Sequence, residues 1–293
     1  MYKDNFITYL RFEKHYSVHT LSAYEKEIDQ FLSFAEQESY TFDAIDFKFL
    51  RYYFSTLREA GKEVRSINRA ISALKSFYKF LLREGLCSKN PMSLIKSLKV
   101  PQKLPTIVEK DKLVQLLDNL EQELESFEDI RDFIVLELLF GTGIRVSELI
   151  KIKEIDVDFY NKKILILGKR SKERFVPINN TLLEELKRYL LEKKQQNFQN
   201  IIPELVVTKE GKPAYRELIY KIVKKYLSMI TSQKKRSPHV LRHTFATALL
   251  DNGADLNAIK ELLGHAGLSA TQVYTHNSAE RLKSIYKQAH PKA

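Results

Sequence analysis

The sequence predicts a mainly α-helical protein of two domains, with a small antiparallel β-hairpin in the C-terminal one. Three observations support this prediction. Apolar residues recur at the 3.6-residue period of a helix through most of the chain. Two short runs rich in β-branched and aromatic residues, around residues 163–167 and 175–178, are typical of strands. A proline-containing stretch separates the two parts of the chain.

The N-terminal domain, residues 1–98, is predicted to be helical throughout. Ser17 can cap the first of three helices, and Gly61 and Gly85 can end the other two. The three apolar stripes span residues 21–35, 47–57 and 66–81. The polar side of the third helix carries candidate phosphate contacts, namely Arg65, Arg69, Lys75 and Lys79. A solvated helix face explains these four residues equally well.

Residues 99–105 contain two prolines and two lysines, and we interpret them as a linker. The C-terminal domain, residues 106–293, begins with a helix over 127–140 that Gly141-Thr142-Gly143 interrupts. The hairpin follows, and its tip is basic, with Lys169, Arg170, Lys172 and Arg174. Further helices are predicted at residues 182–192, 217–229, 240–250, 257–263 and 280–287.

Charge and cysteine content narrow the class of protein. The net charge is +11, and both parts of the chain are basic, which indicates a polyanionic partner held by both domains. Cys87 is the only cysteine, so a disulfide framework or a thiolate zinc cluster is excluded. Apolar runs are too short to span a membrane, and the N-terminus lacks an apolar signal segment. We therefore expect a cytoplasmic protein.

The polar residues of the C-terminal part indicate a functional site only when they are considered together. Arg145 and Glu148 can be an ordinary ion pair one helical turn apart, and a lone tyrosine such as Tyr274 is usually a core or surface residue. The set, however, has a distinctive composition and order. Two arginines, a hairpin lysine, two histidines and a late tyrosine occur as Arg145, Lys169, His239, Arg242, His265 and Tyr274.

This order, with the residues around it, resembles the active site of the tyrosine recombinases, or phage integrases, and is most similar to that of the cellular Xer recombinases. The matching segments are 143–149, 168–177, 239–247, 262–265 and 271–276. The resemblance implies a two-domain C-shaped clamp, with a SAM-like core-binding domain in residues 1–98 and a catalytic domain in 106–293. One position departs from the pattern, because Arg170 stands where Xer hairpins usually have glycine.

The resemblance assigns a role to each candidate, and the chemistry explains the residue types. A phosphodiester gains negative charge during attack, so the planar cations Arg145 and Arg242 suit it. Tyr274 is the nucleophile, and its phenol, with a pKa of about 10, benefits from a nearby proton acceptor, which we expect to be His239.

The other three candidates support this reaction. His265 is expected to donate a hydrogen bond to the transition-state oxygens. Lys169 is expected to protonate the leaving 5′ oxygen. Glu148 is expected to support the arginines and not to act as a base. The implied product is a 3′-phosphotyrosyl link, which conserves bond energy, so neither a metal nor a nucleotide cofactor is required. The sequence agrees, since it has no glycine-rich phosphate loop and no acidic magnesium cluster.

The implied partner is double-stranded DNA with paired half-sites. Members of this family act as four protomers on two synapsed sites, either as one protein or as two related recombinases. The implied role is the resolution of chromosome or plasmid dimers at cell division. In this family the C-terminal segment also docks into a neighbouring protomer, and we expect a final helix over residues 280–290 to do so. The alternative is that this helix packs on its own domain.

Three alternatives remain open from the sequence. An integrase of a mobile element would have the same chemistry and a different task. A DNA-binding protein that has lost catalysis would share the fold, but the complete set of six residues argues against it. A zinc hydrolase could use His239 and His243, which have the spacing of a zinc helix, with His265 and His276. Val240, however, stands where such a helix has its glutamate.

Overall fold

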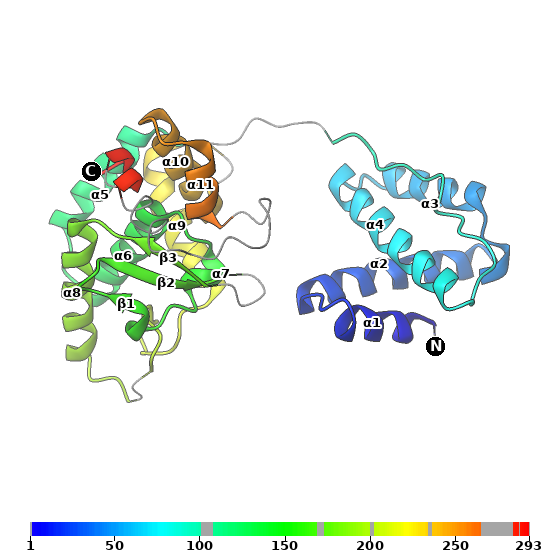
Figure 1. Cartoon of the computed structure of the whole chain (residues 1–293), viewed down its shortest axis with the longest axis horizontal. Helices are drawn as coiled ribbons and strands as arrows, with labels where there is room; N and C mark the ends of the chain where they lie inside the picture. Colours follow the sequence, from blue (N-terminus) through cyan, green and yellow to red (C-terminus); the bar gives the residue numbers. More distant parts are fainter. Residues whose placement is uncertain are drawn as a thin grey trace. The chain divides into compact units, whose positions relative to one another are not determined.

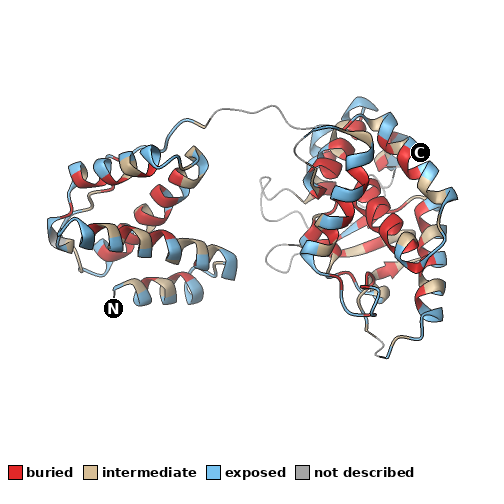
Figure 2. Cartoon of the chain, turned by 180° about the vertical axis from the view of Figure 1, so that it is seen from behind, coloured by how far each residue is buried: buried red, intermediate tan, exposed pale blue. Residues whose placement is uncertain are grey.

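The computed structural model describes residues 2–100, 108–168, 173–199, 202–233, 236–264, 284–286 and 288–292. The chain divides into two compact units, Met1–Lys103 and Leu104–Ala293, and each has its own hydrophobic core (Figure 1). Most of the expected linker lies outside the described residues. Buried positions concentrate on the inner helix faces of each unit, as the period of the apolar stripes predicts (Figure 2).

The described part of the first unit is helical, as expected. Ser17 caps α2 by accepting a hydrogen bond from the Thr20 amide at 3.3 Å, and Asp46 caps α3 in the same way from Phe49 at 2.8 Å. The core contains tilted and edge-on aromatic rings contributed by all four α-helices. The elements are α1 (Tyr2–Phe12), α2 (Val18–Gln37), the short 3₁₀ helix η1 (Phe42–Ala44), α3 (Phe47–Glu59) and α4 (Val64–Arg83).

The described part of the second unit combines helices with one small sheet. Its helices are α5 (Lys110–Gln122), α6 (Phe127–Thr142), α7 (Val146–Leu149), the 3₁₀ helix η2 (Glu154–Asp156), α8 (Asn180–Gln195), α9 (Arg216–Ile230), α10 (Pro238–Asp251) and α11 (Leu256–Leu263). Its strands are β1 (Val157–Asp158), β2 (Lys163–Leu167) and β3 (Glu173–Pro177). The predicted class, mainly α with a small antiparallel sheet, is confirmed.

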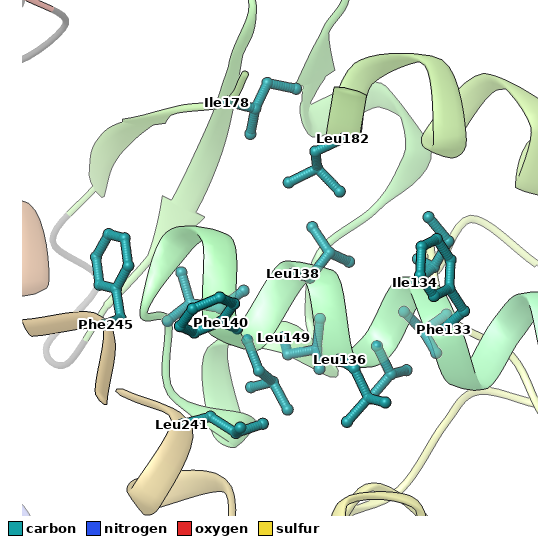
Figure 3. Packing of buried hydrophobic residues seen from close by; sticks show 14 of the residues in the cluster. Phe133, Ile134, Leu136, Leu138, Phe140, Leu149, Ile178, Leu182, Leu241 and Phe245 are labelled. Carbon is teal, nitrogen blue, oxygen red and sulfur yellow. The ribbon is translucent and has the colours of Figure 1, made fainter. Parts of the chain in front are cut away.

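Helix α6 is the central element of this unit and packs against α5, α8, α9 and α10. A capping box between Ser126 and Asp129 begins it. Nearly all of its residues are buried, which explains why its apolar pattern has no clear polar side. Figure 3 shows Leu138 facing Leu182 of α8, while Phe140 lies on the side of α10 near Leu241.

Helix α6 continues two residues beyond its expected end at 140. Gly141 stays helical and lies close to neighbouring elements, since a Cβ there would be 3.5 Å from His290 Nε2 and 3.7 Å from Leu182. The helix stops at Gly143, whose φ of +62° is in the left-handed region that favours glycine. The glycine break that we predicted after this helix is therefore present, but it lies at Gly143 and does not begin at Gly141.

The sheet has the order β1-β2-β3 with both pairs antiparallel. In the hairpin, Lys163 lies opposite Pro177 and Leu167 opposite Glu173. Strand β1 was not predicted, because two residues are too few to show a period. The structure starts β3 two residues earlier than expected, at Glu173. The tip residues Lys169, Arg170 and Lys172 lie outside the described residues.

The C-terminal residues of the described chain pack against α6 of their own unit. Tyr286 is buried and donates a hydrogen bond from its hydroxyl to the Gly141 carbonyl at 2.7 Å. His290 is also buried with its Nε2 3.0 Å from the same carbonyl oxygen, and burial lowers its pKa to about 4. Lys292 Nζ lies 2.6 Å from Glu137 Oε1. In this single chain, residues 284–286 and 288–292 pack on their own domain, which is the alternative to docking into a neighbouring protomer.

Candidate active site

The turn that ends α6 places the first predicted arginine. Gly143 is held so tightly that a Cβ there would lie 2.4 Å from Phe245 and 2.7 Å from Leu263. A larger residue would therefore meet both steric overlap and an unfavourable backbone conformation. Two residues later, Arg145 occupies the N-cap position of α7 with extended backbone. Its side chain is 33% exposed, and both terminal nitrogens of the guanidinium bind protein atoms.

The carboxylate of Glu148, in α7, accepts four hydrogen bonds. Its side chain is only 4% exposed. Oε1 accepts from Arg145 Nη1 at 2.8 Å and from Arg174 Nη1 at 3.1 Å. Oε2 accepts from the Arg145 amide at 2.9 Å and from Arg174 Nη2 at 2.8 Å. Burial by itself would raise the pKa of Glu148, but the bonds and charge of Arg174, together with the bonds from Arg145, hold that pKa below its usual value.

The C-terminal end of α11 is the second fixed feature of the site. The last carbonyls of a helix have no partner within the helix and carry partial negative charge. Here three consecutive carbonyls each accept from a different arginine. The bonds are Arg174 Nε to Leu262 at 3.1 Å, Arg242 Nη2 to Leu263 at 2.7 Å, and Arg145 Nη2 to Gly264 at 3.0 Å.

Arg242 comes from α10 and is 8% exposed. Besides the Leu263 carbonyl, it binds the Gly143 carbonyl through Nη1 at 2.5 Å. Burial, together with the charges of Arg145 and Arg174, lowers the pKa of Arg242 to about 10, while the charge of Glu148 opposes the change. The guanidinium stays cationic at neutral pH. Arg145 and Arg242 thus bind backbone oxygens of adjacent residues and lie at one end of one helix.

The structure brings three of the predicted site residues together: Arg145, Glu148 and Arg242. His239 lies in the first turn of α10, one turn before Arg242, and is exposed, whereas Arg242 is buried on the inner side. Lys169, His265 and Tyr274 lie outside the described residues.

Arg174 has a different environment from the exposed hairpin tip that we expected, and this corrects its place among the candidate DNA contacts. It is the second residue of β3, and its side chain points inward with that of Val176. The strand expected from the sequence began at Phe175, which left Arg174 in the turn. The two-residue period of a strand, extended one step backwards from Val176, is the signal that would have placed Arg174 inside.

The candidate DNA contacts of α4 have mixed surroundings. Arg65, Arg69 and Lys79 are exposed, and Lys75 is half-buried. Arg69 Nη2 lies 2.7 Å from Glu27 Oε1, a carboxylate that is buried between helices. Arg69 therefore neutralises a buried charge of its own unit, in addition to any contact it makes with a partner. Arg170 and Lys172 lie outside the described residues.

Metal sites and membrane spans are absent from the described residues. No group of three or more His, Cys, Asp and Glu residues within them could hold a metal ion, and His265 and His276 of the zinc alternative lie outside them. No helix in this described part of the chain is long and apolar enough to cross a membrane.

Comparison with protein families identifies both parts of the chain. Residues 106–281 match the phage integrase family, and residues 4–85 match the phage integrase N-terminal SAM-like domain. The chain is 36% identical over 292 residues to the tyrosine recombinase XerD of Staphylococcus haemolyticus, covering 99% of this chain and 98% of the relative. It is 38% identical over 294 residues to the tyrosine recombinase XerC of Listeria monocytogenes, with the same coverage.

A solved structure also shares the fold. The XerH site-specific recombinase, bound to a palindromic difH substrate in a post-cleavage complex, superimposes with a TM-score of 0.73. The two are 24% identical, and the match covers 90% of this chain and 78% of XerH.

Proposed function

This chain is a tyrosine recombinase of the phage integrase family, and we propose that it cuts and rejoins DNA at a specific site with Tyr274 as its nucleophile. Arg145 and Arg242 hold the scissile phosphate. His239 accepts the proton of Tyr274, His265 donates to a phosphate oxygen, and Lys169 protonates the leaving oxygen. These roles come from the family resemblance, and the geometry around the two arginines supports them.

The observation that carries the proposal is the convergence of three arginines at the end of α11. The guanidinium groups of Arg145 and Arg174 share the carboxylate of Glu148, and the charge of Arg242 interacts with the same carboxylate. Each of the three also binds one of three consecutive carbonyls at the end of α11. Of the three side chains, Arg145 is the most exposed, at 33%. A phosphodiester bound at Arg145 would therefore meet a rigidly held, strongly basic cluster.

The reaction is a transfer of the phosphoryl group between two hydroxyls. Tyr274 Oη attacks the phosphorus, a P–O bond to Tyr274 forms, and the bond to the 5′ oxygen breaks. The tyrosine proton goes to His239, and the 5′ oxygen takes a proton from Lys169 and leaves as a hydroxyl. A 5′ hydroxyl from a partner strand then reverses each step and joins the new strand. Each arginine contact supplies about 3 kcal/mol to the transition state.

The biological role that best fits the relatives is dimer resolution. Full-length identity of 36–38% to proteins named XerD and XerC supports a cellular recombinase more than a mobile-element integrase. We therefore propose that four protomers, of this chain alone or with a related recombinase, act in the cytoplasm on two synapsed sites of paired half-sites. Recombination there would convert chromosome or plasmid dimers to monomers at cell division.

A covalent-capture experiment tests the activity and locates the DNA site in the same measurement. Genomic DNA of the source organism is sheared, nicked at random with DNase I, and incubated with the protein in EDTA. Fragments that stay attached after denaturation are sequenced. We expect the wild type to enrich one site and Tyr274→Phe to retain none, because only the nucleophilic hydroxyl is lost while net charge is unchanged.

The outcomes separate the alternatives. Gel shifts on the enriched site should show nearly equal DNA binding by the wild type and Tyr274→Phe. An adduct that persists in Tyr274→Phe would place the nucleophile elsewhere. Wild-type protein that binds DNA and captures none would support the inactive DNA-binding alternative. An enriched site at the end of an inserted element, rather than in a chromosome or plasmid backbone, would favour the integrase role.

A further inference from the structure

We infer that Arg174 is a positioning residue of the recombination site, which holds Glu148 and the end of α11 so that Arg145 is aimed at the phosphate. The inference rests on the proposed function, because it concerns the same site. It assigns to Arg174 a role that differs from the DNA contact expected from the sequence.

Arg174 uses its hydrogen-bond donors within the protein. Its side chain is 8% exposed, and three of its five N–H donors bind protein atoms. Two form a bidentate pair with Glu148, and the third reaches the Leu262 carbonyl. A planar guanidinium can make these contacts together, and a lysine ammonium cannot. Arg174 therefore joins β3 to α7 and to α11 at one point, and its side chain is buried within the protein.

Gly264, at the end of α11, lies against Arg174. A Cβ at Gly264 would be 3.2 Å from Cζ and Nη1 of Arg174, so the guanidinium lies directly on this backbone. The carbonyl of the same Gly264 binds Arg145. Arg174 thus supports the backbone at Gly264, whose carbonyl binds Nη2 of Arg145. Nη1 of Arg145 is bound by Glu148, which Arg174 also holds.

Loss of Arg174 would loosen both partners of Arg145. Glu148 would keep its two bonds from Arg145 but would lose the two that hold its carboxylate from the opposite side. The Leu262 carbonyl would lose the partner that it has in Arg174. Arg145 would then have a loosely held partner on each of its terminal nitrogens. A displacement of about 1 Å in a positioning contact lowers a rate by about 10²-fold.

The same residue ties the arginine site to the hairpin. In the register of the sheet, Arg174 lies opposite Ile166 of β2, and Lys169 lies in the chain between these two strands. Because Arg174 is anchored to α7 and α11, the strand that follows Lys169 has a fixed position relative to Arg145. One residue thus sets the position of the phosphate-binding arginine and of the strand next to the proposed general acid.

The pH dependence of the cleavage rate distinguishes a positioning role of Arg174 from a general loss of stability, because a loss of stability alone would not shift the pH at which the rate falls in acid. Among the described residues, the charged groups facing Glu148 are Arg145 at the N-cap of α7, Arg174 of β3 and Arg242 of α10. Removing Arg174 leaves burial as the dominant effect, so the pKa of Glu148 rises. Glu148 then takes up a proton at a higher pH than in the wild type. The acid limb of the rate profile should therefore move to higher pH.

The experiment measures single-turnover cleavage of a nicked duplex, carrying the site enriched by the wild type, at saturating protein over a range of pH. We compare Arg174→Met, Arg174→Lys, Glu148→Gln and the double variant Arg174→Met/Glu148→Gln. The control is Arg131→Met, which breaks another buried pair, since Arg131 Nη2 lies 2.6 Å from Asp132 Oδ1. Thermal unfolding and half-site gel shifts report folding and DNA binding for each variant.

We expect Arg174→Met to cleave about 10²-fold more slowly than the wild type, with its acid limb at higher pH and half-site binding nearly intact. Arg174→Lys should keep the acid limb near that of the wild type, because it retains the charge, but recover only part of the rate. The double variant should be no slower than the slower single variant, as expected for residues that act as one unit.

Two results would overturn the inference while leaving the proposed function in place. One is wild-type cleavage by Arg174→Met. The other is a loss of rate that matches Arg131→Met at equal loss of stability, with an unmoved acid limb. Should the Met variant fail to fold, the Lys variant decides alone, and a wild-type rate in it would show that the bidentate geometry is not needed. Failure of the wild type itself to form an adduct would instead contradict the proposed function.

Discussion

Replacing Lys292 by methionine tests how the C-terminal residues are fixed to α6. The side chains of Lys292 and Glu137 are 10% and 3% exposed, and their charged atoms are 2.6 Å apart. Removing one member of a buried ion pair leaves the other charge without compensation, which costs about 3–5 kcal/mol. For a unit of this size, a loss near 3 kcal/mol lowers Tm by roughly 6–12 °C. We expect Lys292→Met to show a loss of this order at neutral pH.

The pH dependence of this loss follows from Glu137. Burial raises the pKa of Glu137, and Lys292 opposes the rise, while Asp118 and Glu121 add to it. Without Lys292 the folded-state pKa rises further above the unfolded value. A carboxyl of raised pKa contributes stability at low pH, and that contribution is lost as pH rises through the folded pKa. The stability gap between wild type and Lys292→Met should therefore be small in acid and widen towards neutral pH.

Calorimetry across this pH range measures the gap, with two controls. Lys187→Met removes an exposed pair, in which Lys187 and Glu184 are 49% and 65% exposed, and should cost at most about 0.5 kcal/mol. The double variant Lys292→Met/Glu137→Gln should recover most of the loss, since no uncompensated charge remains. A Lys292→Met shift no larger than that of Lys187→Met, or a gap that does not change with pH, would refute the reasoning.

Two further variants test the site itself. Lys169→Ala should slow cleavage, whereas Arg170→Ala should mainly weaken DNA affinity. A substrate with a 5′-bridging sulfur has a leaving group that needs no protonation, so it should rescue only Lys169→Ala. A lack of rescue would remove Lys169 from the general-acid role. Gly143→Ala should lose about 3 kcal/mol in thermal unfolding and slow cleavage through Arg242, because a Cβ would overlap Phe245. Its control is Gly253→Ala, because Gly253 also has a positive φ, of +86°, but a Cβ there would have no atom within 4 Å. An equal loss of stability in the two variants would mean that the packing at Gly143 is unimportant.

Sequence periodicity predicted most of the helices because their buried faces are regular over several turns. The stripe of α4, for example, contains Ile67, Leu74 and Phe77, all of which are fully buried. The prediction omitted two helices of ordinary length, α1 and α5. It also failed where an element is too short or a boundary depends on a tertiary contact. Strand β1 has two residues, and α6 runs on through Gly141 because the C-terminal segment packs against it.

The candidate site could be predicted as a set of residues but not as an arrangement. The order of six residues in the chain, from Arg145 to Tyr274, was sufficient to identify the family, and the structure brings Arg145 and Arg242 of this set together with Glu148. The partners that fix them are main-chain oxygens of Gly143, Leu263 and Gly264, and every residue type has such an oxygen. The position of these oxygens depends on how the ends of α6 and α11 pack next to each other. A local pattern of side chains in the sequence does not reveal this packing.

The burial of the charged Arg242 side chain costs free energy in the folded protein, and hydrogen bonds to main-chain carbonyls reduce this cost. A pKa lowered from 12.5 to about 10 corresponds to roughly 3 kcal/mol of unfavourable interaction for the charged form in the folded chain. The Gly143 and Leu263 carbonyls limit that cost, but they carry only partial charges. Under the proposed function, a phosphate bound at Arg145 would bring a full negative charge close to Arg242 and would offset part of this cost. The offset would increase as the transition state gains negative charge.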